Sequence, residues 1–263
     1  MSFTENNKNT VVYMTAPNIS TTHAFTTRIG GVSSGIFESL NLAQRAGDEP
    51  DKVMENYIRI CNAIGISTDD IVRSTQVHGT NIRVVTRDDR GGLLKPDEPQ
   101  ADGLVTNSPG VALMVFAADC VPILLHDPVK KAVGAVHAGW RGTVANIVGV
   151  AVRKMADEFG CSPVDIRAAI GPCISACCFA TDSDVADAVK EALPENADDL
   201  IKQHGHKYKV DLKETNRILI TKAGLTDIAV SDECTSCLDK KYWSHRKTQG
   251  NRGIQTAVIF VQP

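Results

Sequence analysis

Two histidines and one cysteine lie where apolar segments end and the chain turns. Their contexts read QVHG around His78, AADCVP around Cys120 and AVHAGWRG around His137. Strand ends that lead into loops commonly carry binding groups on a rigid scaffold. Two imidazoles and a thiolate suit zinc in tetrahedral geometry, and three protein ligands leave the fourth position for water or substrate. These residue types therefore predict a zinc centre, with copper as the alternative metal.

Other interpretations of these three residues stay open, because no short motif links them along the chain. Cys120 could be a buried core thiol, and both histidines could be hydrogen-bonded structural residues. A thiol hydrolase would use Cys120 as its nucleophile and His137 as its base. A non-enzymatic binding protein stabilised by zinc would hold the metal and turn over no substrate.

Charged residues beside these segments indicate an anion site. Asp119 directly precedes Cys120, and its carboxylate is a candidate to orient one of the histidines. Arg28, Arg141 and Arg246 each lie beside a glycine-rich or histidine-bearing turn. A guanidinium holds phosphate or carboxylate through two hydrogen bonds, and glycine lets the backbone approach a ligand.

The sequence contains eight cysteines. In a cytosolic chain of this size they favour free thiols, metal ligation or catalysis over disulfides. Cys234 and Cys237 form a lone C-x-x-C, without the second pair that a structural zinc site requires. Cys177 and Cys178 are adjacent, and we expect their side chains to point apart. The HGH segment at 204–206 is expected to be a polar loop.

Helical and strand-like segments alternate along the chain. Apolar residues at helical spacing predict helices over 51–64, 143–159, 184–193 and roughly 212–223. Apolar runs, which suit strands covered on both faces, predict strands over 11–14, 23–27, 71–77, 82–86, 103–106, 111–117, 123–126, 132–137, 166–170, 228–230 and 255–261. The prediction is a single α/β (α+β) domain over residues 1–263, with mixed sheets sandwiched by helices. Residues 1–20 are expected to include a flexible N-terminal segment.

Composition limits the classes of function. The 263-residue chain has a net charge of -3, which favours neither nucleic acid nor a membrane as a partner. The N-terminus lacks the apolar core of a secretory signal, and no apolar run reaches the roughly 20 residues of a spanning helix. We therefore expect a cytoplasmic protein. The sequence has no P-loop, G-x-S-x-G or G-x-G-x-x-G motif, which argues against an NTPase, a serine hydrolase and a Rossmann dehydrogenase.

The same segments resemble a known protein family nearly end to end. The matching stretches include HAFTTRIGGVSSG, QVHGTNI, ADCVPILLHDP, AVGAVHAGWRGTV, AAIGPCISACCF and YWSHRKTQGNRGIQTAVIF. They resemble the YfiH/YlmD family of laccase-domain proteins, formerly called DUF152 or multicopper polyphenol oxidases. The resemblance implies an α/β sandwich similar to that of bacterial cytotoxic-factor deamidases, and a zinc bound by His78, Cys120 and His137.

The resemblance also implies an activity on purine nucleosides. It implies phosphorolysis of adenosine, inosine, guanosine and methylthioadenosine, together with deamination of adenosine. Arg28, Arg141 and Arg246 would then hold the phosphate in line with the ribose, and His245 would transfer protons. The older alternative is a copper phenol oxidase, but seven dispersed histidines supply few ligands for about four coppers. The expected partners are nucleosides and phosphate, and the expected state is a monomer or a homodimer.

Two positions depart from the family pattern. Ala118 stands where the family often has threonine, which removes a hydroxyl close to the metal. Arg45 stands at or near a position that is often histidine or aromatic. We expect the additional guanidinium of Arg45 to strengthen phosphate binding or to change substrate choice.

Overall fold

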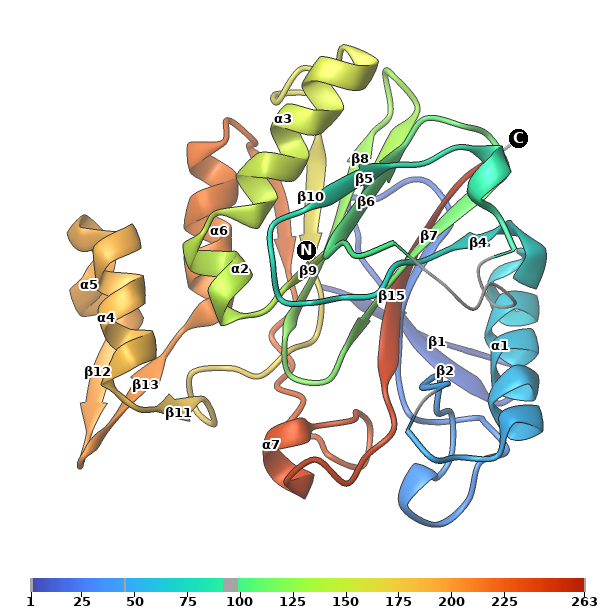
Figure 1. The fold of residues 1–263 in the computed structure, drawn as a ribbon, viewed down its shortest axis with the longest axis horizontal. Coiled ribbons are helices and arrows are strands. Elements are labelled where there is room, and N and C mark those ends of the chain that lie inside the picture. The colour runs from blue at the N-terminus through green and yellow to red at the C-terminus, as the bar shows by residue number, and fades with distance from the viewer. Residues whose placement is uncertain (1, 45, 92–98, 263) are drawn as a thin grey trace.

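Two six-stranded sheets pack face to face in the computed structural model, which describes residues 2–44, 46–91 and 99–262 (Figure 1). The first sheet has the order β1 (Thr4–Lys8), β2 (Val11–Thr15), β3 (His23–Thr26), β15 (Gln255–Val261), β7 (Val111–Ala117) and β4 (Ile71–Val72). The second has the order β14 (Asp227–Val230), β10 (Arg167–Ile170), β8 (Val121–Asp127), β9 (Ala132–Ala138), β6 (Gly103–Thr106) and β5 (Ile82–Val84). Both sheets are mixed, because β4, β5 and β14 pair in parallel with their neighbours and the other pairs are antiparallel.

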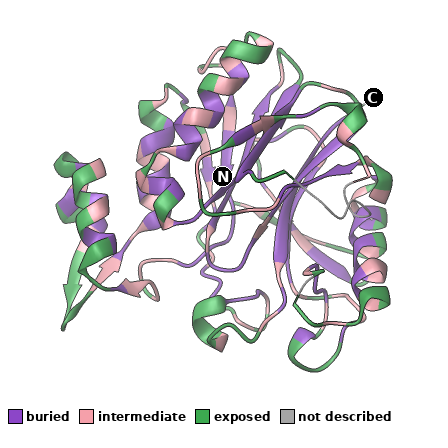
Figure 2. Cartoon of the chain, in the orientation of Figure 1, coloured by how far each residue is buried: buried purple, intermediate pink, exposed green. Residues whose placement is uncertain are grey.

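Continuous apolar runs form the central strands because both faces of each sheet are covered. Leu113 of β7 and Leu124 of β8 belong to one core between the sheets. Their neighbours Met114 and Ile123 point to the opposite faces, where helices pack. Burial on both faces removes the polar alternation of a half-exposed strand. The central strands are accordingly buried over almost their whole length (Figure 2).

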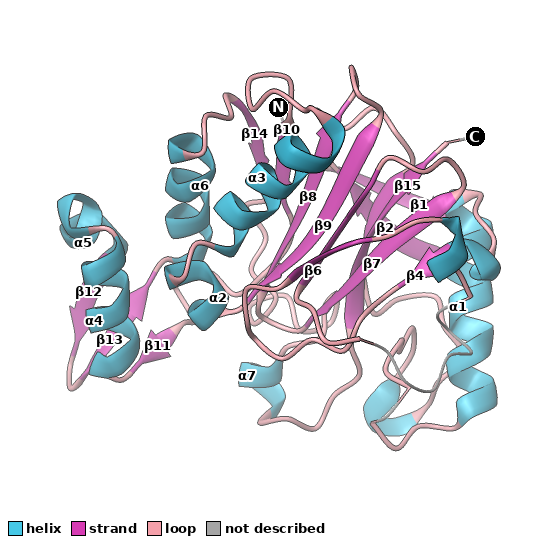
Figure 3. Cartoon of the chain, turned by 45° about the horizontal axis from the view of Figure 1, so that its top comes forward, coloured by secondary structure: helices cyan, strands magenta, loops and turns pink. Residues whose placement is uncertain are grey.

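Helices cover the outer face of each sheet (Figures 1 and 3). The helix α1 (Pro50–Ile64) packs Tyr57 and Ile60 against the first sheet. The second sheet is covered by α2 (Trp140–Val144), α3 (Ile147–Phe159) and α6 (Leu212–Lys222). Four layers result, in the order helix, sheet, sheet, helices. This arrangement confirms the predicted α/β fold with mixed sheets sandwiched by helices.

A small three-stranded sheet projects from one side of the sandwich (Figure 3). Its order is β11 (Ala180–Thr181), β13 (Lys207–Val210) and β12 (Ile201–His204), and α4 (Ser183–Ala192) and α5 (Ala197–Leu200) accompany it. The sequence predicted α4 but not this sheet, because its short strands are largely polar and exposed. The HGH segment forms the tip of the β12–β13 hairpin, with Gly205 at a φ of +62°. The remaining short helices are α7 (His245–Thr248) and the 3-10 turns Gly35–Phe37, Thr68–Asp70, Arg87–Asp89 and Pro194–Asn196.

Three expected segments differ from the structure. The strand expected over 71–77 ends at Val72, because the Gln76 side chain, rather than backbone, bonds the N–H and C=O of Phe116 at 2.7 and 2.8 Å. The helix expected over 143–159 is divided, because Asn146 has a φ of +57° and its side chain caps α3 at the N–H of Gly149. Within residues 1–20, for which a flexible segment was expected, β1 and β2 form a regular antiparallel ladder.

The described ranges contain no helix that is both long and apolar enough to cross a membrane.

Candidate active site

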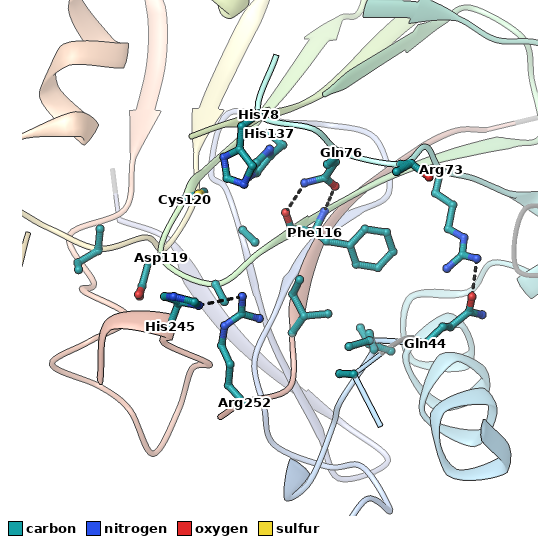
Figure 4. Close-up of a pocket in the computed structure, with 18 of the residues that line it drawn as sticks. Gln44, Arg73, Gln76, His78, Phe116, Asp119, Cys120, His137, His245 and Arg252 are labelled. Carbon is teal, nitrogen blue, oxygen red and sulfur yellow. Dashed lines mark hydrogen bonds between the residues drawn. The ribbon is translucent and has the colours of Figure 1, made fainter. Parts of the chain in front are cut away.

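The structure brings His78, Cys120 and His137 together, as expected (Figure 4). His78 lies in the loop after β4, Cys120 in the turn between β7 and β8, and His137 in β9. Their potential ligand atoms all lie within 4.8 Å of one another. The two imidazole rings are 4.8 Å apart between centroids and nearly perpendicular, at 79°. Three segments distant in sequence therefore present two nitrogens and one sulfur to the same point.

Asp102 orients this group from below the surface. It lies just before β6, is completely buried, and its Oδ1 is 2.9 Å from His137 Nδ1. It also accepts the backbone N–H groups of Val77, His78 and Gly79 at 2.8–3.1 Å. The carboxylate thus holds one histidine by its ring and the other by its backbone. Such contacts fix which ring nitrogen faces a metal.

Asp119 has a different role from the one expected. Its Oδ1 accepts the hydroxyl of Thr235 at 2.6 Å, and its Oδ2 accepts the backbone N–H of Arg246 at 2.6 Å. Both carboxylate oxygens are therefore used to dock the C-terminal loops beside the site. The carboxylate that orients a histidine is Asp102, which the sequence analysis missed because nothing near residue 102 marks it as a neighbour of residue 137.

The backbone around the three side chains is strained and crowded. His78 has a φ of +59°, and Asp119 has a φ of +89°. A left-handed conformation costs a non-glycine residue about 1–2 kcal/mol, and the three N–H bonds to Asp102 offset this cost at His78. Gly139 lies so close that an added Cβ would be 2.5 Å from His78 Nδ1 and 3.5 Å from Cys120 Sγ.

The protonation states of the two histidines are set differently. Burial, His137 and Arg141 lower the pKa of His78, although Asp102 opposes them. Burial alone would lower the pKa of His137, but hydrogen bonds with Asp102 and Cys120 raise it above its usual value. Burial likewise disfavours the charged form of Asp102, but the bonds from His137, Gly79 and Val77 lower its pKa. The lowered pKa of His78 favours the neutral imidazole that a metal requires, whereas the raised pKa of His137 opposes it.

The donor set fits a single soft or borderline divalent metal. His78 and His137 offer imidazole nitrogens, Cys120 offers a thiolate, and Asp102 supplies the outer carboxylate that ligating histidines commonly have. Three protein ligands with solvent access are typical of catalytic zinc rather than structural zinc.

A cavity of about 660 Å³ opens in front of the three residues. Figure 4 shows His78 and His137 together at one end of the cavity. The basic side chains of His245, Arg252 and Arg73 lie away from them. Phe116 and Phe179 provide aromatic walls, and Leu42 and Ile254 add apolar surface. The volume lies within the range of small-molecule sites, about 300–1,000 Å³.

Besides His78 and His137, four basic side chains of the described residues line this cavity: Arg73, His245, Arg246 and Arg252. His245 and Arg246 were expected there, whereas Arg73 and Arg252 were missed. Arg252 Nη2 is 3.5 Å from His245 Nδ1, and its buried Nε has no hydrogen-bond partner among the residues that the structure describes. Arg246 Nη1 donates to the carbonyls of Cys178 and Ala180, and Arg73 bonds to Gln44. The sequence clue to Arg252 was its glycine neighbours, Gly250 and Gly253.

The other expected arginines lie elsewhere. Arg28 is not a cavity residue: its guanidinium donates to the carbonyls of Glu38 and Asp239 and stacks 3.9 Å from the Trp243 ring. It is therefore a structural arginine between two loops. Arg141 influences His78 electrostatically but stacks on Trp140 at 4.2 Å and does not line the cavity. The expectation for Arg45 lies outside the described residues. Ala118 lines the cavity beside the metal-competent group, as expected.

Comparison with known proteins identifies the family. A purine nucleoside phosphorylase, YlmD of Bacillus subtilis, is 39% identical over 241 residues, which cover 89% of this chain and 86% of that protein. The adenosine deaminase RL5 of an unknown prokaryotic organism is 32% identical over 255 residues, covering 93% and 96%. The crystal structure of YlmD from Geobacillus stearothermophilus superposes with a TM-score of 0.93 at 35% identity, covering 99% of both chains. Residues 22–262 match the family described as multi-copper polyphenol oxidoreductase laccase, and the chain belongs to this family.

Proposed function

We propose that this chain is a zinc-dependent purine nucleoside phosphorylase that also deaminates adenosine. The substrates would be adenosine, inosine, guanosine and methylthioadenosine. One observation carries the proposal: the three residues that could bind a metal and a group of basic residues face the same cavity of about 660 Å³. The first set is His78, Cys120 and His137, and the second set, called the basic group below, is Arg73, His245, Arg246 and Arg252. Relatives named as purine nucleoside phosphorylases and as an adenosine deaminase support it.

The cavity walls suit a nucleoside. Phe116 and Phe179 offer ring surfaces for a purine, and Leu42 and Ile254 exclude water around it. Aromatic stacking of this kind contributes about 1–3 kcal/mol per base. The apolar walls would hold the base, leaving the basic group for the phosphate.

Arg252 is the main candidate to bind phosphate. Its buried Nε is a donor with no partner in the described part of the chain, and an unpaired buried donor costs about 1–3 kcal/mol until a ligand satisfies it. His245 lies next to it, and Arg246 lines the same cavity. A phosphate dianion placed there would receive charge-assisted hydrogen bonds, the stronger class.

The chemistry then requires positioning and charge stabilisation. A phosphate oxygen forms a bond to C1′ of the ribose while the bond from C1′ to the purine nitrogen breaks. The bonding pair leaves with the base, which takes up a proton, and His245 would supply it. Arg252 and Arg246 would hold the phosphate in line for attack, which lowers the barrier by orientation.

His78, Cys120 and His137 would hold the metal at the other end of the cavity. When bound, zinc supplies a Lewis acid that polarises the substrate and can activate water for deamination. Asp102 keeps His137 oriented for this role through the Nδ1 contact.

A panel assay tests the proposal. Inosine, guanosine, adenosine and methylthioadenosine are incubated with and without phosphate, and free base, ribose 1-phosphate and ammonia are measured. Phosphate-dependent release of base is expected from all four, and phosphate-independent ammonia from adenosine. Absence of any turnover in metal-replete protein would contradict the proposal and favour a zinc-stabilised binding protein.

Variants separate the roles of the two groups. Arg252→Lys should raise the KM for phosphate by about tenfold or more, because an ammonium group cannot replace the planar guanidinium that donates two parallel hydrogen bonds. Arg59→Lys is the matched control: its guanidinium bonds Glu55 on α1 and does not line the cavity, so the kinetics of this variant should not change. His78→Ala should remove metal and turnover together. If metal-free protein keeps full activity that alkylation of Cys120 abolishes, a thiol mechanism is supported instead.

A further inference from the structure

Four cysteines gather at a place separate from the candidate active site. Cys177, Cys178, Cys234 and Cys237 bring their sulfur atoms within 4.8 Å of one another. Cys177 Sγ lies 3.7 Å from Cys178 Sγ and 3.6 Å from Cys237 Sγ, and Cys178 Sγ lies 3.4 Å from Cys237 Sγ. All four are free thiols. The adjacent cysteines were expected to point apart and the C-x-x-C to lack partner cysteines; both expectations are wrong.

The pairing of two strands explains why these cysteines meet. β10 and β14 are neighbours (Figure 3) and run parallel, so the chain leaves both strands at the same end of the sheet. The segment after β10 carries Cys177 and Cys178, and the segment after β14 carries Cys234 and Cys237. A bridge between Cys173 and Cys234 continues this pairing, with the Thr235 N–H donating to the carbonyl of Cys173 at 3.1 Å.

The sulfur positions fit one tetrahedral metal ion. Zinc binds thiolate sulfur at about 2.3 Å, so the edge of a regular tetrahedron of four sulfurs is about 3.8 Å. Three of the S···S distances, at 3.4–3.7 Å, lie slightly below that value. They are far longer than the roughly 2.05 Å of a disulfide bond. In an iron–sulfur cluster, the thiolates bind several iron atoms and would be spread more widely than these four.

Two groups near the cluster would stabilise negative charge there, one by a hydrogen bond to Cys234 and one by its positive charge. The backbone N–H of Ser175 donates to Cys234 Sγ at 3.4 Å. The ammonium group of Lys213, a buried residue of α6, joins the two segments by donating to Ser175 Oγ, Ser231 O and Glu233 O at 2.7–3.2 Å. All three acceptors are uncharged. The buried ammonium group of Lys213 therefore lies between the two segments, and none of these three hydrogen bonds neutralises its charge. A metal held by four thiolates carries a net negative charge, which Lys213 would partly balance.

We propose that Cys177, Cys178, Cys234 and Cys237 bind one structural zinc ion, distinct from the metal at His78, Cys120 and His137. Four thiolates complete the tetrahedral shell and leave no position for substrate, as in structural zinc sites. Iron or cobalt would occupy the same donors when zinc is scarce, because soft ligands accept these metals too.

The zinc would fix one wall of the active-site cavity. The carbonyl of Cys178 accepts Arg246 Nη1 at 3.2 Å, and the following residue, Phe179, lines the cavity. Thr235, inside the C-x-x-C turn, donates to Asp119, the neighbour of Cys120. Loss of this metal should therefore loosen Phe179 and Arg246 without removing any ligand of the first site.

Metal stoichiometry tests the proposal. Full-length protein, purified under reducing conditions without chelator, should contain about two zinc ions per chain by mass spectrometry of the native protein and by elemental analysis. Cys237→Ser and His78→Ala should each contain about one, and the double variant close to none. With cobalt in place of zinc, His78→Ala should show the intense thiolate-to-metal absorption of a four-sulfur site, and Cys237→Ser should not.

Two further variants control for general damage. Cys61→Ala removes a free cysteine buried in α1 and should leave the zinc content unchanged. Cys237→His should restore the second zinc, because imidazole can replace a thiolate. The proposal is overturned if wild-type protein holds about one zinc that His78→Ala abolishes, or if the four cysteines are found as disulfides with no second metal. The wild-type measurement decides this even if a variant fails to fold.

Discussion

At the scale of single residues, the candidate active site depends on a carboxylate that is not a metal-ligand candidate. Asp102 is buried and receives four hydrogen bonds, from the His137 ring and from three consecutive backbone N–H groups. It therefore sets the direction of His137 Nε2 and the conformation of the His78 loop together. Partners of this kind contribute about 10- to 100-fold to metal affinity.

Asp102→Asn should lower zinc affinity by about 10- to 100-fold. The neutral amide loses the charge that favours the His137 N–H, and its NH₂ group would face backbone donors. The measurement is a competition titration of the apo-protein with a coloured chelator.

Asp127→Asn is the matched control for this variant. Asp127 is equally buried and accepts the N–H groups of Val129 and Lys130, but at the end of β8 remote from Cys120. It should lower the free energy of unfolding by about 1–3 kcal/mol and leave zinc affinity intact. Equal zinc affinity in Asp102→Asn and wild type would refute the orienting role of Asp102.

At the scale of elements, the site is made where turns approach closely. β9 leads through Ala138 and Gly139 into α2, and this turn passes directly beside the loop that carries His78. Gly139 has a φ of −66°, which any residue can adopt. The position therefore requires glycine for space and not for backbone freedom.

Gly139→Ala should lower zinc affinity by about 10- to 100-fold, although it changes no ligand. The new methyl group would meet His78 Nδ1 at 2.5 Å, so the imidazole must move, and overpacking costs about 1–3 kcal/mol. Gly79→Ala is the control on the other side of His78, where the nearest heavy atom is 3.6 Å away. The zinc affinity of both variants is measured by titration. Equal affinities would disprove the steric argument.

At the scale of the whole molecule, the two-sheet core encloses histidines that must stay neutral. His126 of β8 lies two residues from Leu124 and so faces the same core between the sheets. Burial first, and then Arg167, lower its pKa to about 4, with Asp127 opposing and His23 assisting. His23 accepts the Ala16 N–H at Nε2, and its pKa is also lowered by burial.

The protein should lose stability as the pH falls from 7 to 5, and His126 should account for about 2 kcal/mol of that loss. Unfolded His126 takes up a proton near its ordinary pKa of 6.5, but folded His126 does so only near 4. The unfolded state thus binds more protons between these values, so the free energy of unfolding decreases as the pH is lowered. Urea unfolding at pH 7 and pH 5 measures this decrease.

His126→Leu should reduce the decrease in the free energy of unfolding between pH 7 and pH 5 by about 2 kcal/mol, since the titrating group is gone. His206→Gln, at the exposed hairpin tip, should show the same loss as wild type. An undiminished loss in His126→Leu would show that other groups cause the acid sensitivity.

Much of the fold followed from local sequence, because apolar runs leave strands few alternatives. Val111–Ala117 and Gln255–Val261 have the bounds that their composition predicted, and α1 was found within a residue of its expected start. The strands of the small sheet had no such signal, since β12 and β13 are largely polar and exposed, and within them only Val210 is fully buried in the core. Sequence also indicated which residue types could bind a metal, and resemblance to a family grouped His78, Cys120 and His137.

Tertiary structure alone decided the neighbours that complete these sites. Asp102 meets His137, Arg252 meets His245, and the adjacent cysteines 177 and 178 meet the C-x-x-C turn. Each contact depends on strand order and on which loops leave the same sheet edge, as β10 and β14 do. A side chain's local sequence determines what it can bind, whereas the distance between two remote side chains depends on how every intervening element packs.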